Sequence, residues 1–173
     1  MVTAVLTEEG TIEGSFSMNL SGYRGVEVRR RVRDQERATA EQRAREAAED
    51  ATGSDNLNVL HVVITNADDV DEPVNLEARF ELTEPLEIIG DHIYLTPMLI
   101  DRIKENPFQA EQRTYPVEFA YPYVRTYGAE IAIPEGLVVE SLPEDVLLQA
   151  PGAGYATYGP SPLQTAFCVC RCA

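Results

Sequence analysis

The chain of 173 residues has no tryptophan, a single lysine and no cysteine before Cys168. Its other cysteines, Cys170 and Cys172, also lie among the last six residues, so the body offers no disulfide framework. It has no apolar run of about 18 residues or more, so we expect no membrane-spanning helix. Basic residues are few, with 14 lysines and arginines against 29 acids, and the net charge is −15. An acidic surface repels phosphates and anionic lipids, so we expect neither nucleic acid nor a membrane surface as the main partner.

What is present is typical of a globular domain: 44% hydrophobic and 25% charged residues. A chain of this length can bury roughly 70% of its unfolded surface, so it needs no metal or disulfide to fold. The charge is unevenly distributed. Eight arginines and four acids give residues 24–45 a net charge of +4, whereas fifteen acids and three bases give residues 46–105 a net charge of −12.

Hydrophobic periodicity predicts mostly strands. Residues 12–20 and 74–82 alternate between apolar and polar side chains, as strands with one buried face do. Gly90-Asp91 is a two-residue hairpin signal between two short apolar runs. Further strands are predicted at 3–7, 59–65, 86–89, 92–95, 117–121, 127–133, 137–141, 146–149 and 155–158. Short strands separated by frequent turn signals favour a mainly β fold, an antiparallel β-sandwich-like domain.

One helix is predicted, near 39–52. Thr39-Ala40-Glu41-Gln42 fits a capping box, the following residues are rich in alanine, arginine and glutamate, and Gly53 can end the helix. The sequence leaves open whether residues 29–38 extend this helix upstream. We therefore expect a single β-sandwich-like domain over 1–159. Residues 160–173 are predicted to form an atypical, cysteine-containing tail that is disordered or truncated.

No residue pattern points to catalysis, a cofactor or a metal. His61 lies inside an apolar run and His92 follows the hairpin turn, and neither accompanies a nucleophile motif, so we interpret both as structural or surface histidines. Four acids crowd the loop after Asn66: Asp68, Asp69, Asp71 and Glu72. They lack the EF-hand spacing, and a solvated loop is favoured over a calcium site. We therefore predict no catalytic, cofactor-binding or metal-binding residues.

Two groups of residues are candidates for binding. The first is an arginine run, for which a solvated face is favoured over docking to an acidic partner. The second group is four of the six tyrosines between residues 115 and 158. These tyrosines either line a carbohydrate or peptide groove or are ordinary sheet residues. The candidates are Arg29, Arg30, Arg31, Tyr121, Tyr123, Tyr155 and Tyr158.

Several short phrases in the second half of the chain resemble a known family. They are Asn106-Pro107-Phe108, Glu111-Gln112-Arg113, Tyr115-Pro116-Val117-x-Phe119, Ile133-Pro134-Glu135-Gly136 and Val139-Glu140-Ser141-Leu142-Pro143. With the glycines and the arginine-rich stretch of the first half, they resemble the C-terminal β-domain of bacterial transglutaminase-like proteins. That domain, of unknown function, follows the transglutaminase core, and the resemblance covers roughly residues 3–158.

The resemblance implies that the chain is not an enzyme, because the family's catalytic Cys, His and Asp belong to the core and none carries over. It implies a non-catalytic accessory domain, either structural or mediating contacts with a neighbouring transglutaminase-like domain or another protein. The alternative is a carbohydrate- or peptide-binding β-module that uses the tyrosine-rich face. Parents in this family are commonly exported, which implies a periplasmic or other extracytoplasmic setting.

The tail from Pro160 departs from the family pattern, and both ends of the chain look cut from a longer protein. A sheet that lacks its last strands exposes an edge. We therefore also expect a dimer formed by pairing of edge strands.

Overall fold

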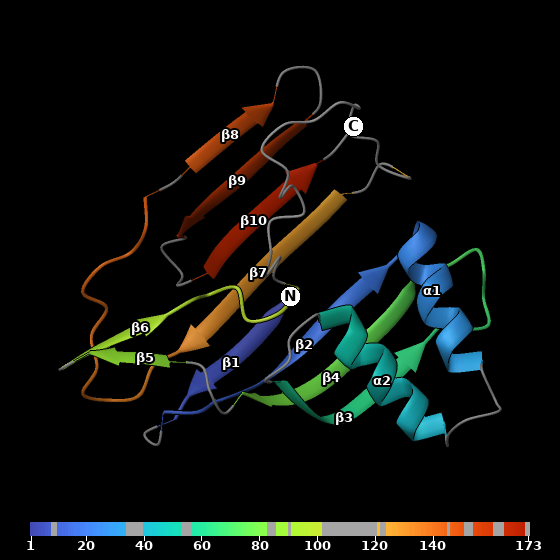
Figure 1. The fold of residues 1–173 in the computed structure, drawn as a ribbon, viewed down its shortest axis with the longest axis horizontal. Coiled ribbons are helices and arrows are strands. Elements are labelled where there is room, and N and C mark those ends of the chain that lie inside the picture. The colour runs from blue at the N-terminus through green and yellow to red at the C-terminus, as the bar shows by residue number, and fades with distance from the viewer. Residues whose placement is uncertain are drawn as a thin grey trace, which may run out of the picture.

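The computed structural model describes residues 1–7, 10–33, 40–52, 57–82, 86–89, 91–101, 121, 124–144, 146–150, 154–160 and 165–171. Ten strands and two helices lie within these ranges (Figure 1). In chain order they are β1 (Val2–Leu6), β2 (Ile12–Leu20), α1 (Gly22–Arg33), α2 (Ala40–Thr52), β3 (Leu57–Thr65), β4 (Val74–Leu82), β5 (Leu86–Ile89), β6 (His92–Leu95), β7 (Val124–Ala132), β8 (Val146–Ala150), β9 (Gly154–Pro160) and β10 (Thr165–Arg171).

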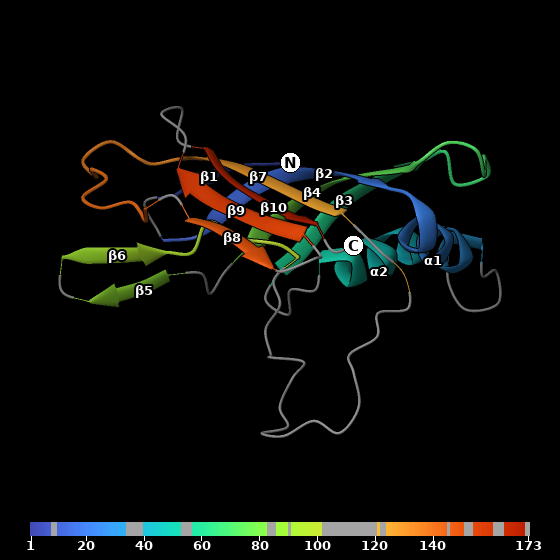
Figure 2. The ribbon, with the colours of Figure 1, turned by 90° about the horizontal axis from the view of Figure 1, so that it is seen from above.

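The fold is mainly β, as predicted, but the sandwich is not confirmed. Five strands in the order β3-β4-β2-β1-β7 form a mixed sheet, which β10, β9 and β8 continue beyond β7. The sheet is mixed because β1 pairs with β7 in parallel, whereas its other pairings are antiparallel. Both helices lie on one face of this sheet, where a sandwich would have a second sheet (Figure 2). The strands β5 and β6 pair only with each other among the described elements.

The core lies between the sheet and the two helices. The alternation read from the sequence puts Phe16 of β2 and Phe80 of β4 on this face, with their ring centroids 6.0 Å apart. Ala47 and Ala48 of α2 are almost completely buried, and their small side chains let the helix approach the strands closely. The other face of the sheet carries mostly polar residues. Alternate residues of each strand therefore separate a buried layer from an open face.

The predicted helix is confirmed as α2, but no separate helix was predicted over the residues of α1. The buried or half-buried residues of α1 recur at helical spacing and are Arg24, Gly25, Val28, Arg29 and Val32. An arginine at a buried position hides this periodicity in the sequence. Gly22, with φ of +56°, allows the sharp change of direction between β2 and α1.

Most predicted strands are present, with two exceptions. The residues predicted as a strand at 137–141 form neither helix nor strand. The strand predicted at 117–121 lies, except for Tyr121, outside the described residues. Within the expected tail, Thr165–Arg171 forms β10, which pairs with β7 and β9. The division into a domain over 1–159 and a tail over 160–173 stays a prediction.

Candidate protein-interaction surface

The β5–β6 hairpin projects from the main sheet (Figures 1 and 2). Apolar side chains on this hairpin are exposed rather than packed into the core: Ile89, Ile93 and Tyr94. A two-stranded hairpin is marginally stable alone, because it can bury little apolar surface between its strands. Its exposed apolar residues therefore leave surface available for another contact.

The segment 133–144 lies beside this hairpin and adds more exposed apolar residues (Figure 2). His92 on β6 and Glu140 on the segment form an ion pair when the histidine is protonated, with Nε2 and Oε2 3.0 Å apart. The exposed residues of the segment are Leu137, Val138, Val139 and Leu142, and Val138 is the most exposed at 87%. Strand alternation puts Ile89, His92 and Tyr94 on one face of the hairpin and Ile93 on the other. We call the four exposed residues of the segment, with Ile89 and Tyr94, the hairpin surface.

Charges around the hairpin surface have one sign. Residues 86–95 and 133–144 contain no lysine or arginine, and their five acids are Glu87, Asp91, Glu135, Glu140 and Glu144. Soluble proteins seldom expose large contiguous apolar patches, and those rimmed by polar groups usually mark an interaction site. This arrangement suits a partner that presents apolar side chains together with basic ones.

The predicted binding residue Arg29 is buried within the chain's own structure, with only 8% of its surface exposed. Its Nη2 donates hydrogen bonds to the backbone oxygens of Asn66, Asp69 and Glu72 in the loop between β3 and β4. The solvated interpretation does not fit Arg29, because its guanidinium holds this acidic loop against α1.

Two neighbouring arginines also contact acids of the same chain. Arg31 forms ion pairs with Glu27 one turn earlier on α1 and with Asp50 on α2. Arg33 lies 3.3 Å from the carboxylate of Asp68. Arg30 is exposed on α1. Arg31 and Arg33 therefore contact acids of their own chain, and docking of these arginines to an acidic partner stays a prediction.

The candidate tyrosines are only partly described. Tyr121 is half-buried and stacks on Tyr23 of α1, with ring centroids 4.4 Å apart. Tyr123 lies outside the described residues, and Tyr155 and Tyr158 are at register positions on β9 opposite Gln149 and Val146 of β8. Whether the four converge on one groove stays untested. Tyr23, which is 65% exposed, is an aromatic residue of this region that the sequence reasoning did not single out.

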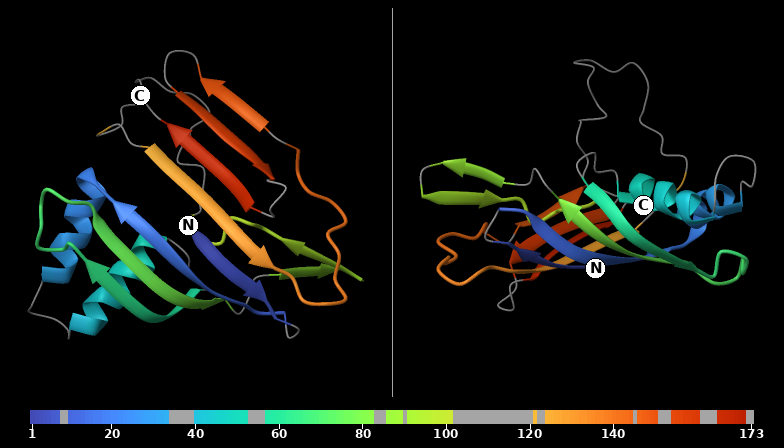
Figure 3. Two further views of the ribbon diagram at one scale, coloured as in Figure 1. Left: turned by 180° about the vertical axis from the view of Figure 1, so that it is seen from behind. Right: turned by 90° about the horizontal axis from the view of Figure 1, so that it is seen from below.

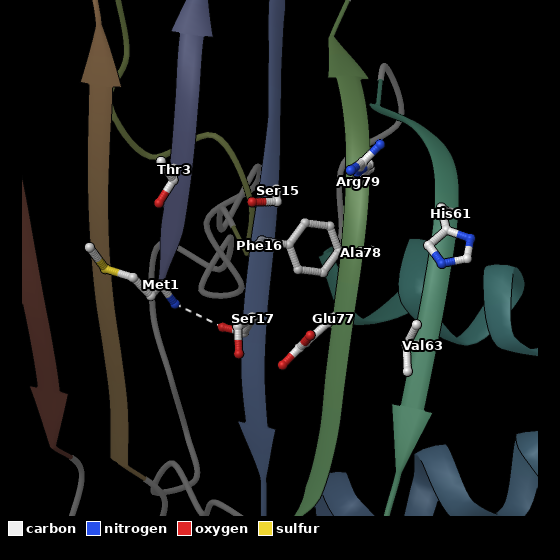
Figure 4. Close-up of a pocket in the computed structure, with 10 residues that line it drawn as sticks. All are labelled: Met1, Thr3, Ser15, Phe16, Ser17, His61, Val63, Glu77, Ala78 and Arg79. Atoms are coloured by element: carbon white, nitrogen blue, oxygen red, sulfur yellow. Dashed lines mark hydrogen bonds between the residues drawn. The ribbon is translucent and has the colours of Figure 1, made fainter.

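The open face of the sheet has a shallow hollow of about 290 Å³ (Figure 4). Arg79 of β4 lines it, with Ser15 of β2 and His61 of β3 as its cross-strand neighbours on either side. Two strand spacings of about 4.8 Å therefore separate Ser15 from His61. No hydrogen bond joins these two described side chains, so they do not form a serine–histidine pair. The hollow offers hydrogen-bonding groups without a nucleophile held by a base.

Within the part of the chain that the structure describes, no cluster of three or more His, Cys, Asp or Glu side chains could hold a metal ion. Neither of the two described helices is long and apolar enough to cross a membrane.

Comparison with known proteins gives one match. Residues 91–158 match the family model DUF3858, described as a "Domain of Unknown Function with solved-structure structure". The matched range includes β6, the segment 133–144 and the strands β7 and β8. No curated protein and no solved structure gave a significant match.

The hairpin surface was not predicted from the sequence. Its apolar residues had been assigned to strands, and a strand residue is ordinarily half-buried. The absence of lysine and arginine around it was the available signal, but the charge pattern alone does not show which residues are exposed.

Proposed function

We propose that this chain is a non-catalytic accessory domain of a transglutaminase-like protein and that it makes protein contacts through the hairpin surface. The observation that carries the proposal is the set of six exposed apolar side chains on one face of the hairpin and on the segment 133–144, which the contact of His92 with Glu140 joins. The partner is the transglutaminase-like domain that the sequence resemblance implies, and the setting is extracytoplasmic by the same resemblance.

The resemblance and the exposed surface meet in the same residues. Two phrases that carry the resemblance, Ile133–Gly136 and Val139–Pro143, belong to the segment 133–144. This segment forms neither helix nor strand, and the DUF3858 match also includes it. Residues that give a domain its family character while remaining exposed support a role in contacts rather than in the core.

The energetics favour a contact centred on Val138. Fully burying a side chain of this size stabilises a complex by roughly 1.5–3 kcal/mol before the costs of association are subtracted. Ile89, Tyr94 and Leu142 are each more than half exposed and can contribute around it. The acids at the rim add attraction for a basic partner, which acts mainly on the association rate.

The test is binding of the full chain to the transglutaminase-like core domain encoded in the same genome, measured by calorimetry. Val138→Asp should weaken binding by about tenfold or more, because a carboxylate would have to be desolvated in an apolar contact. The matched control is Val124→Asp, since Val124 is also highly exposed but lies on β7. Equal affinities for wild type and Val138→Asp would contradict the proposal.

The non-catalytic part is tested separately with a glutamine-containing peptide and a fluorescent primary amine. We expect no transamidation or hydrolysis by the chain alone. Turnover that disappears when one residue of this chain is substituted would show that the chain is itself an enzyme.

The alternative function is carbohydrate or peptide binding by the tyrosine-rich face. The stacked pair of Tyr23 and Tyr121 favours it, because an exposed ring is a common platform for a sugar or a proline. A glycan array with wild type and Tyr121→Ala tests it: specific binding lost in the variant would favour this function over the accessory one.

A further inference from the structure

The strand β3 is the outermost strand of the main sheet. Among the strands that the structure describes, it is at one end of the strand order and pairs with β4 alone. In Figure 1 it is the lowest strand of the sheet, and the right panel of Figure 3 views the sheet from below, on the β3 side. The backbone groups on its outer side can therefore pair with another strand.

The sequence of β3 does little to protect this edge. Its nine residues, Leu57–Thr65, include no aspartate, glutamate, lysine, arginine, glycine or proline. Natural edge strands are usually kept apart by such charges, by proline or by bulges. The one such device in β3 is the register shift between Val59 and His61. Leu60 and Val63 expose 50% and 44% of their surface.

We propose that a second copy of this chain pairs with β3 in antiparallel orientation, so that two sheets become one across a two-fold axis. Two identical strands related by a two-fold axis run antiparallel and offer each other the same surface. Charge also favours this edge. Two copies that each carry a net charge of −15 repel one another. The strand β3 has no acidic residue, so pairing of β3 with β3 of a second copy brings no carboxylates of the two strands together.

The length of β3 favours it over the strand at the opposite edge. β8 has five residues against nine in β3, so it offers fewer backbone hydrogen bonds to a second copy. Pairing of β3 with β8 of another copy would be heterologous and would form open chains rather than a closed dimer.

Analytical ultracentrifugation of the full chain tests the proposal. We expect a monomer–dimer equilibrium whose dimer fraction rises with added salt, because salt screens the repulsion between two acidic copies. An assembly held by ion pairs would weaken with salt instead. The double variant Leu60→Lys/Val63→Lys should lose the dimer, since it places like charges across the two-fold axis.

The matched control is Val5→Lys. Val5 is exposed by 51% but belongs to β1, which has a partner strand on both sides. The Val5→Lys variant should dimerise as wild type does. Circular dichroism should show that this variant and the double variant are both folded. Amide hydrogen exchange should slow within Leu57–Thr65 as the protein concentration rises.

A wild-type chain that stays monomeric, a dimer that survives the double variant, species larger than a dimer, or unchanged exchange in β3 would each overturn the proposal. It does not depend on the accessory function, because it uses neither the hairpin surface nor a transglutaminase-like partner.

Discussion

Arg29 is the residue whose role differs most from its prediction. A run of arginines usually indicates a solvated face, yet this side chain is buried and donates to three carbonyl oxygens of the β3–β4 loop. The loop satisfies only part of the guanidinium, because these bonds all come from Nη2 and the buried Nε has no hydrogen-bond partner among the described residues. The negative charges of the acidic residues in that loop also favour the positively charged guanidinium of Arg29.

Replacing Arg29 with methionine tests this role. Arg29→Met keeps an apolar stem of similar length but removes the donors, so the free energy of unfolding should fall by about 1–3 kcal/mol. Arg30→Met is the matched control, because Arg30 is exposed on the same helix and its loss should change stability by less than about 0.5 kcal/mol. Urea unfolding measures both. Equal effects of the two substitutions would show that Arg29 does not hold the loop.

Tyr127 is the buried residue with the clearest dependence on pH. Burial raises the pKa of its phenol from 10.0 to about 12. The hydroxyl donates to the oxygen of Pro97 at 2.8 Å and accepts from the N–H of Leu99 at 3.0 Å. Below pH 10 the phenol is neutral in both states. Between about pH 10 and 12 the unfolded chain ionises first, so the native state loses stability as pH rises.

Tyr127→Phe should therefore have two effects. At neutral pH it should lower the free energy of unfolding by about 0.5–1.5 kcal/mol, because the buried hydroxyl loses its bonds with Pro97 and Leu99, while the N–H of Leu99 keeps a 3.1 Å bond to the oxygen of Pro97. As pH rises from 9 to 12, the difference from wild type should shrink. Denaturant unfolding across this range measures it, with Tyr94→Phe as the exposed control. A difference that stays constant with pH would contradict the raised pKa.

Among the elements, the β1–β2 pair depends on a close approach at Gly14. A Cβ atom added there would lie 2.4 Å from the backbone oxygen of Thr3 and 2.9 Å from the Cα of Ala4. These are backbone neighbours, so the strands themselves would have to move. Gly14→Ala should destabilise the fold by roughly 1–3 kcal/mol. Thermal unfolding measures this change. The control Ser15→Ala, on the open face of the same strand, should change the unfolding temperature little, and equal effects of the two substitutions would contradict the prediction.

The sequence predicts an element well when its residues alternate between a buried and an exposed face, and poorly when the element depends on which strand lies beside it. The alternation in β2 and β4 is visible because one face of each strand is buried. The parallel pairing of β1 with β7 is not visible, since periodicity says which face is buried but not which strand is the neighbour. The helix α1 was missed because Arg29 occupies a position where periodicity looks for an apolar residue.

The hairpin surface shows the same limit. The residues 137–141 have the β-branched, apolar composition of a strand, and strand propensity depends on a partner that this segment lacks in the structure. Composition therefore predicted the wrong local structure. It did record the feature on which the proposed function rests, which is a group of apolar residues with acids and no bases near them in the sequence.

On the scale of the whole molecule, the net charge of −15 is distributed by the fold. Arg31 and Arg33 of α1 contact acids of α2 and of the β3–β4 loop, so part of the positive charge of this helix is paired within the chain. The hairpin surface lies far from α1 along the longest axis of the molecule (Figure 1). The chain thus presents an apolar surface with acidic residues nearby at one end and a partly paired arginine helix at the other.

The most direct measurement is amide hydrogen exchange of the chain, alone and mixed with the transglutaminase-like core domain of the same genome. Contact through the hairpin surface predicts slower exchange in peptides covering 91–95 and 134–144 and unchanged exchange in α1. Slower exchange confined to α1 or to the open face of the sheet, or none at all, would contradict the account.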